Sequence, residues 1–212
     1  MRCRKIGENF QDIQEKLDFE HLRMTKEYLM AKLDEKIRNC HKCRLHKTRV
    51  NAVPGEGPVD AKIMICGQAP GRTEDVLGRP FTGVSGTFLN KLLRLIKISR
   101  ESLFITSSLK CFPPNNRPPK SDELKICRHY LEEQIKIINP KIIIALGNSA
   151  IQTLLNKKSL ISLIHGEPRE KNGIIIFPTF HPAAAMRFPK IRILIKEDFK
   201  KFKDILKKFN LI

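Results

Sequence analysis

The sequence predicts an α/β fold in which a parallel sheet is covered by helices on both faces. Four short apolar runs alternate with stretches of helical periodicity, a pattern typical of βαβ units. The runs are apolar at nearly every position, as in strands that are buried on both faces. Ligands of such sheets bind beyond the carboxyl ends of the strands.

The predicted strands cover residues 63–66, 103–107, 142–146 and 174–177, and the predicted helices that follow them cover 84–96, 121–138, 148–155 and 195–209. The first and third strands end at Gly67 and Gly147, where the chain can turn sharply. Ser121 can cap the second helix, whose first turn contains Asp122 and Glu123. These three element ends therefore have a local reason to lie where we place them.

The N-terminal segment, residues 1–35, is charged and has apolar residues at roughly helical spacing. It predicts one or two amphipathic helices that form an extension ahead of a domain at residues 36–212. A chain of 212 residues suits one such domain with a sizeable core.

Composition indicates a nucleic-acid partner. Forty Lys and Arg residues against 22 Asp and Glu leave a net charge of +18, which favours a polyanion. A generally lysine-rich composition is the alternative explanation. No apolar run reaches the roughly 18 residues of a membrane span, and no secretory signal is evident. We therefore expect an intracellular protein without a membrane partner.

Six cysteines suggest metal binding rather than disulfides in an intracellular chain. Cys40 and Cys43 form a CxxC pair, and Cys111 and Cys127 can complete a set of four ligands. Spacing alone leaves zinc and an iron–sulfur cluster open, and also four unrelated buried thiols. We expect Cys66 to be an ordinary core residue.

Loops follow every predicted strand, and their sequences are unusual. Residues 67–80 after the first strand contain glycines and a Glu–Asp pair, and Phe81 follows directly. An exposed aromatic side chain in a loop is costly unless a flat ligand stacks on it; a hinge with a buried Phe is the alternative. Further loops follow at 107–119, 147–148 and 180–187, and we expect three of the four loops to converge on one site.

Four stretches together resemble family 4 uracil-DNA glycosylases. Residues 67–86, GQAPGRTEDVLGRPFTGVSG, are similar to the family signature GExPGxxEDxxGxPFVGxAG. CHKCRLHKTRVNAVPGEG, ITSSLKCFPPNNRPPKSDELKIC and FPTFHPAAAMR are similar to the family's first cysteine segment, its second cysteine segment with a Pro-rich loop, and its C-terminal signature. The matches run in order from about residue 38 to residue 189.

The resemblance implies a three-layer α/β/α sandwich around a four-stranded parallel sheet. It also implies a 4Fe–4S cluster on Cys40, Cys43, Cys111 and Cys127, and a hydrolase that removes uracil from DNA in base-excision repair. We expect such an enzyme to be a monomer in the cytoplasm of a prokaryote.

The resemblance also gives roles to individual residues. His181 should stabilise the departing uracil anion, and Glu74 should orient water or support the positive sugar. The predicted substrate pocket consists of Gly67, Gln68, Ala69, Phe81 and Ser107, in which Phe81 stacks on the flipped base. Ala184 and Met186 should enter the minor groove, while Arg187 and Arg117 meet phosphates. Lys110 is a further candidate for a backbone contact.

Two positions depart from the family pattern. Gln68 stands where the family has Glu, and Ser107 stands where the family has the Asn that reads the uracil edge. A serine makes fewer hydrogen bonds than a carboxamide. Thr82, Gly83 and the TSSLKC segment lean towards family 5, whereas HPAAAMR at residues 181–187 leans back towards family 4. We therefore expect uracil opposite guanine as the first substrate, with hypoxanthine and xanthine as further candidates.

Three competing functions follow from the same residues. The loss of the family Asn and Glu allows a lesion-binding protein that does not cut. An electron-transfer protein is disfavoured because no ferredoxin-like run of cysteines occurs. A zinc structural domain is the third possibility.

Overall fold

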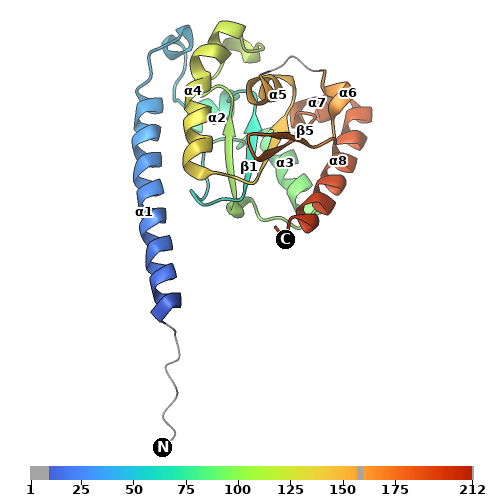
Figure 1. Ribbon diagram of the computed structural model, residues 1–212. Helices are drawn as coiled ribbons and strands as arrows, with labels where there is room; N and C mark the ends of the chain where they lie inside the picture. The colour runs from blue at the N-terminus through green and yellow to red at the C-terminus, as the bar shows by residue number, and fades with distance from the viewer. Residues whose placement is uncertain (1–9, 157–159, 212) are drawn as a thin grey trace, which may run out of the picture.

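A five-stranded sheet forms the middle layer of the computed structural model, which describes residues 10–156 and 160–211 (Figure 1). Its strands are β1 (Ile63–Gly67), β2 (Leu103–Ser107), β3 (Ile142–Leu146), β4 (Arg169–Lys171) and β5 (Ile174–Thr179). They lie in the order β2-β1-β3-β5-β4, and all neighbours pair in parallel except β4 with β5. The predicted α/β class is confirmed.

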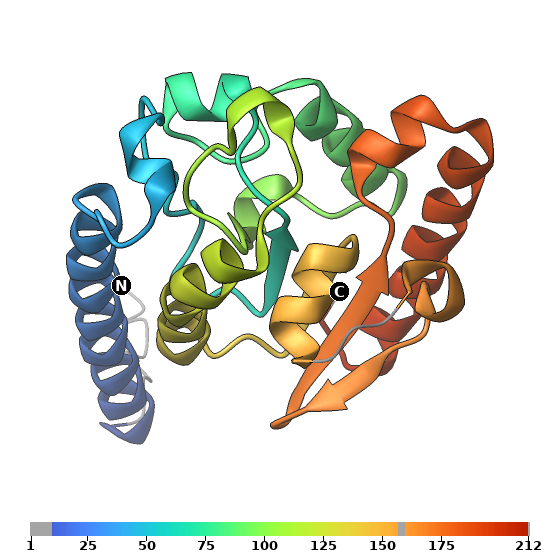
Figure 2. The same ribbon diagram turned by 90° about the horizontal axis from the view of Figure 1, so that it is seen from above.

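The helices are α1 (Phe10–Arg38), α2 (Arg72–Leu77), α3 (Val84–Leu95), α4 (Ser121–Ile138), α5 (Asn148–Leu155), α6 (Ile161–Ile164), α7 (Pro182–Arg187) and α8 (Pro189–Lys208), with 3-10 turns η1 (Arg44–Lys47), η2 (Arg100–Ser102) and η3 (Pro114–Asn116). Helices α1, α4 and α5 contribute to the core on one face of the sheet, and α3, α7 and α8 to the core on the other (Figure 2). The result is the predicted three-layer sandwich.

Alternate residues of each strand feed the two cores. In β1, Met64 and Cys66 point to the α1–α4–α5 side, whereas Ile63 and Ile65 point to the α3–α8 side. All four are at most 5% exposed. Burial on both faces therefore explains why the strand sequences lack the polar alternation of a half-exposed sheet. Cys66 is a core residue, as expected.

The expected number of strands, four, is wrong by one. Arg169–Lys171 pairs antiparallel with β5 and forms a charged edge strand. Asn172 and Gly173 connect the two strands with φ angles of 52° and 75°, the left-handed values that a two-residue hairpin turn requires. The Asn-Gly pair was the available signal. The loop at 67–80 likewise contains a short helix, α2, that the sequence reading missed.

The described part of the N-terminal extension lies in one helix, α1, of 29 residues. Met30, Leu33 and Ile37 are buried in the core that α4 shares, so the end of α1 packs on the domain. Its N-terminal half projects beyond the body in Figure 1, and Leu22 and Met24 are exposed there. Cys3 lies outside the described residues. None of the described helices has the length and apolarity needed to cross a membrane.

Candidate active site

The carboxyl ends of the parallel strands bring the predicted site loops together. Gly67 at the end of β1 is in register with Ser107 at the end of β2, and its carbonyl accepts a hydrogen bond from Ser108 N at 2.9 Å. On the other side, Gly147 N donates to Thr179 O of β5 at 2.8 Å. The loops after β1, β2, β3 and β5 therefore start from one edge of the sheet.

Phe81 occupies a constrained position at this edge. Its φ angle is +50°, which is rare for an aromatic residue and typical of functional sites. A Cβ atom on Gly67 would lie 2.7 Å from the Phe81 ring, and one on Gly86 would lie 1.7 Å from its carbonyl oxygen. Both glycines are therefore needed for the ring to reach this place. The ring lies against the end of β1, and Phe81 is 8% exposed. Of the two alternatives for this loop, the structure therefore has the buried Phe and not the exposed aromatic ring.

Arg100 holds the Phe81 segment through two hydrogen bonds. Its guanidinium donates to the carbonyl of Pro80 at 2.7 Å and to that of Phe81 at 3.4 Å. The sequence reading missed Arg100, because it lies 19 residues after Phe81 and belongs to no recognisable motif. Only the fold brings the two segments together.

His181 lies beside Phe81. Their ring centroids are 5.9 Å apart and the planes are inclined by 28°. His181 is the N-cap of α7, and its Nδ1 accepts a hydrogen bond from Ala183 N at 3.1 Å. Because a backbone N–H can only donate, Nδ1 carries no proton and the neutral ring holds its proton on Nε2. Burial lowers the pKa of His181 to about 4, and the nearby charge of Glu74 offsets this only in part.

Glu74 connects the beginnings of two helices. Its Oε2 accepts from Gly71 N at 3.0 Å and its Oε1 accepts from Gly83 N at 2.9 Å. Gly71 and Gly83 are the N-caps of α2 and α3. Both carboxylate oxygens are thus committed to the loop that carries Phe81, and the residue is 8% exposed. This geometry suits a group that positions the loop.

Gln68 and Ser107, the two residues that depart from the family pattern, both lie at the strand ends. Gln68 Oε1 accepts from Ser149 Oγ of α5 at 3.1 Å, which fixes the carboxamide orientation. The Ser107 hydroxyl lies near Gly67 and has no hydrogen-bond partner within the described residues. Ala69 packs against the core beside them. A free hydroxyl and an oriented carboxamide therefore border the place where Phe81 meets His181.

The four predicted metal ligands surround one cavity, whose lining consists of Cys40, Cys43, Cys111, Cys127, Ile37, His46, Arg49, Lys110, Ile126 and Tyr130. Arg49 Nη1 donates to Cys111 Sγ at 3.0 Å. Burial raises the pKa of the Cys127 thiol to about 12. In residues 10–156 and 160–211, no three His, Cys, Asp or Glu side chains are arranged to hold a single metal ion.

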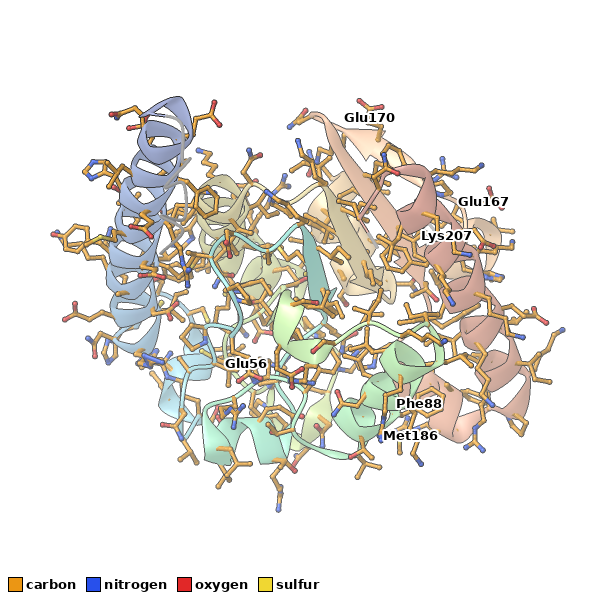
Figure 3. The ribbon with its side chains drawn as sticks, turned by 90° about the horizontal axis from the view of Figure 1, so that it is seen from below. Glu56, Phe88, Glu167, Glu170, Met186 and Lys207 are labelled. Atoms are coloured by element: carbon orange, nitrogen blue, oxygen red, sulfur yellow. The ribbon has the colours of Figure 1, made fainter. Side chains whose placement is uncertain are left out.

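The residues predicted to touch DNA fall into two groups. Ala184 is partly exposed, and Met186 and Arg187 are exposed at the end of α7, whereas Ala185 points inward. Figure 3 shows Met186 next to Phe88 of α3, in agreement with the packing of α3 on α7. These side chains form an apolar edge with one cation.

Two basic residues of the loop after β2 already form hydrogen bonds within the protein. Arg117 forms a bidentate pair with Glu123, at 2.6 and 2.9 Å. Lys110 is 1% exposed, and its Nζ donates to Thr106, to the Ser107 carbonyl and to Gln134. The expectation that Lys110 contacts the DNA backbone is therefore wrong, because the ammonium group is inside the protein. A DNA contact by Arg117 stays a prediction.

Comparison with known families agrees with this arrangement. Residues 54–210 match the model of the uracil DNA glycosylase superfamily. The chain belongs to this superfamily. A type-4 uracil-DNA glycosylase of Saccharolobus solfataricus is 45% identical over 181 residues, which cover 81% of this chain and 84% of that protein. A type-4 uracil-DNA glycosylase of Thermotoga maritima is 42% identical, with 87% and 98% covered.

The type-5 relatives are more distant. A type-5 uracil-DNA glycosylase of Pyrobaculum aerophilum is 30% identical over 148 residues, which cover 62% of this chain and 65% of that protein. The similarity to type-4 uracil-DNA glycosylases is thus both higher and longer, which confirms the resemblance read from the motifs.

Proposed function

We propose that this protein removes uracil from DNA by hydrolysing the bond between the base and the deoxyribose. The observation that carries the proposal is the pairing of Phe81 with His181 at 5.9 Å, on loops that meet at the carboxyl edge of the sheet. A flipped base must leave the helical stack before the bond can be cut. The Phe81 ring offers a flat surface on which such a base stacks.

The bond between C1′ and N1 breaks with its electron pair moving to the base. The departing uracil is then an anion with charge on O2, and the sugar is an electron-poor centre that a water molecule attacks. His181 presents an Nε2–H donor, because its Nδ1 is held by Ala183 N. A neutral donor aimed at the developing charge lowers the barrier without having to transfer its proton. The attacking water gives one proton to solvent as the sugar hydroxyl forms, and solvent returns a proton to the uracil anion, which completes the hydrolysis.

The remaining pocket residues position and select the base. Gln68, oriented by Ser149, and the hydroxyl of Ser107 supply polar groups for the base edge. Because a hydroxyl makes fewer contacts than the family's carboxamide, selection of uracil should be weaker and hypoxanthine or xanthine should be accepted. Glu74 holds the Phe81 loop through Gly71 and Gly83 and is assigned a positioning role.

Cys40, Cys43, Cys111 and Cys127 are proposed to hold a 4Fe–4S cluster. Four thiolates can bind a zinc ion or a cluster in which each iron takes one thiolate, and the four thiols line one cavity. The resemblance of the two cysteine segments to those of family 4 uracil-DNA glycosylases favours the cluster. The cluster would tie α1, η1, β2 and α4 together. Purified protein should contain about four iron atoms per chain and no stoichiometric zinc.

The apolar end of α7 is assigned to the DNA. Ala184 and Met186 would fill the space left by the flipped nucleotide, and Arg187 would meet a phosphate. The net charge of +18 supports a DNA substrate. The monomeric state and the cytoplasmic location stay predictions from the sequence.

The activity is tested with oligonucleotides that carry uracil, hypoxanthine or xanthine, in duplex and single-stranded form. After incubation, alkali cuts the strand wherever a base has been released. Cluster-loaded protein should release uracil. His181→Ala should lose about 100- to 1000-fold in rate, the usual effect of removing one donor from a developing anion. His21, exposed on α1, provides the matched control, and His21→Ala should keep full activity.

Two results would change the assignment. Tight binding of uracil-DNA without any base release would favour the lesion-binding alternative. Full activity of His181→Ala would remove His181 from the mechanism.

A further inference from the structure

An arginine-lined pocket of about 440 Å³ shares Arg49 with the cysteine cavity, and its lining consists of Arg38, Arg49, Val50, Asn51, Ala52, Leu77, Gly78 and Arg79. The three arginines come from separate segments: the end of α1, the loop after η1 and the loop after α2. Only the fold brings them to one place. Such convergence of guanidinium groups is typical of sites for phosphate or carboxylate.

The cations at this pocket are only partly neutralised. Arg38 has no side-chain hydrogen bond or ion pair within the described residues. Arg79 uses its Nε for Glu56, at 2.8 Å, and its side chain is 68% exposed. Glu56 is shared with Arg100, whose Nη2 lies 3.0 Å away. One carboxylate is therefore divided between two guanidiniums. The carboxylate of Asp34, one turn before Arg38 in α1, lies within electrostatic reach of Arg38 but forms no hydrogen bond with it.

The other groups around the pocket do not oppose an anion. Asp75 is 4% exposed, and its carboxylate accepts from the backbone N–H groups of Val50 and Asn51. The carbonyl of Arg38, at the end of α1, accepts from Arg49 Nη2 at 2.7 Å. The negative charge of Asp75 and the carbonyl dipole at this helix end are thus already matched by donors.

The pocket lies at one end of the edge that carries the active site. Helix α2 begins directly after the loop at Gly67–Gly71 and ends at Leu77, which lines the pocket. Six helical residues span about 9 Å. Figure 2 shows α2, the loop after β2, α3 and α7 along the same edge of the molecule. A DNA strand that places a base at Phe81 and follows this edge away from α7 would run along α2.

We propose that Arg38 and Arg79 bind a backbone phosphate of the DNA at a distance from the flipped nucleotide, beside the charge of Arg49, whose two Nη groups are held by Cys111 Sγ and the Arg38 carbonyl. This inference rests on the proposed function. Guanidinium groups form bidentate hydrogen bonds to phosphate oxygens, and the described lining contains no aromatic side chain on which a base could stack. The site therefore contributes affinity and register along the strand and does not read sequence.

Arg38→Gln is the test, because Arg38 touches no cysteine and lies outside the catalytic pocket. The dissociation constant of cluster-loaded protein is measured against salt concentration with a duplex carrying 2′-fluoro-deoxyuridine, which resists cleavage, and with the same duplex without a lesion. Arg38→Gln should weaken both complexes by a similar factor and reduce the slope of log K against log salt by about 0.9. Arg169→Gln, which removes an exposed arginine from β4 at the far edge of the sheet, should leave the slope unchanged.

A scan with neutral methylphosphonate linkages locates the contact. At one position the neutral linkage should weaken wild-type binding and leave Arg38→Gln unaffected. An unchanged salt slope in Arg38→Gln, an equal loss in Arg169→Gln, or no such position in the scan would each overturn the pocket assignment. Uracil release by the wild type is measured in parallel. Normal release together with any of these results overturns only the phosphate site. A wild type that neither binds nor cuts DNA would overturn both the phosphate site and the proposed function.

Discussion

The protonation of His181 makes a quantitative prediction about stability. Burial lowers the pKa of His181 to about 4 from an ordinary value near 6.5. Above about pH 6.5 the ring is neutral in both the folded and the unfolded chain, so this residue adds no pH dependence. Between the two pKa values the unfolded chain binds a proton that the folded protein excludes. The folded state is therefore destabilised as the pH falls through this window, and the effect stops below about pH 4.

The size of the effect follows from the two pKa values. Each pH unit between them is worth about 1.4 kcal/mol, so the full window amounts to about 3 kcal/mol. About 2 kcal/mol of this should be lost between roughly pH 7 and pH 5. His181→Asn is the matched variant, because Asn can still accept at the N-cap of α7 but does not titrate in this range.

Denaturant unfolding of both proteins at the two pH values measures the difference, and contributions from other titrating groups cancel in the comparison. Wild type should lose about 2 kcal/mol more than His181→Asn on acidification. The single-turnover rate of uracil release should stay level from neutral pH to about pH 5. An equal pH dependence of stability in the two proteins, or a rate that falls with an apparent pKa near 6.5, would refute the buried neutral histidine.

Other substitutions address the Phe81 segment and its surroundings. Gly86→Ala should reduce uracil release by more than tenfold and stability by about 1–3 kcal/mol. The reason is that the added Cβ would lie 1.7 Å from the Phe81 carbonyl oxygen. Normal release rates and a normal thermal unfolding curve would argue against this packing. Ser107→Asn should raise the ratio of uracil to hypoxanthine release by about tenfold, the value of one added hydrogen bond, and an unchanged ratio would exclude Ser107 from base selection. Gly173→Ala should destabilise the protein by about 1 kcal/mol through backbone strain alone, since its φ is +75° and no atom lies within 4 Å of the added Cβ; any loss of uracil release would contradict a purely structural role.

Much of the fold could be predicted because the strands are buried on both faces. The apolar runs around Met64 and Ile143 have no polar alternation, so the positions of these strands could be predicted from the sequence. The charged edge strand Arg169–Lys171 has no apolar run of its own and escaped notice, although Asn172 marked its turn. This segment is a strand because it pairs with β5, and its own composition does not predict one.

The candidate site could be predicted only where motifs name the residue. Phe81 and His181 were found in this way, but the left-handed conformation of Phe81 depends on the space left by Gly86 and on the clamp from Arg100. Lys110 was misjudged because a lysine is usually exposed. Its burial depends on polar partners from β2 and α4, which no local pattern reveals.

The two margins of the sheet have a consequence for association. At one margin, β4 is only three residues long and carries a charge at every position, which discourages a foreign strand from joining. At the other, Glu56 exchanges backbone hydrogen bonds with Ile105 of β2, at 2.8 and 2.9 Å, and so occupies donors that would otherwise be open. We therefore expect that, even in a concentrated or heated solution, molecules of this protein do not aggregate readily by pairing their edge strands.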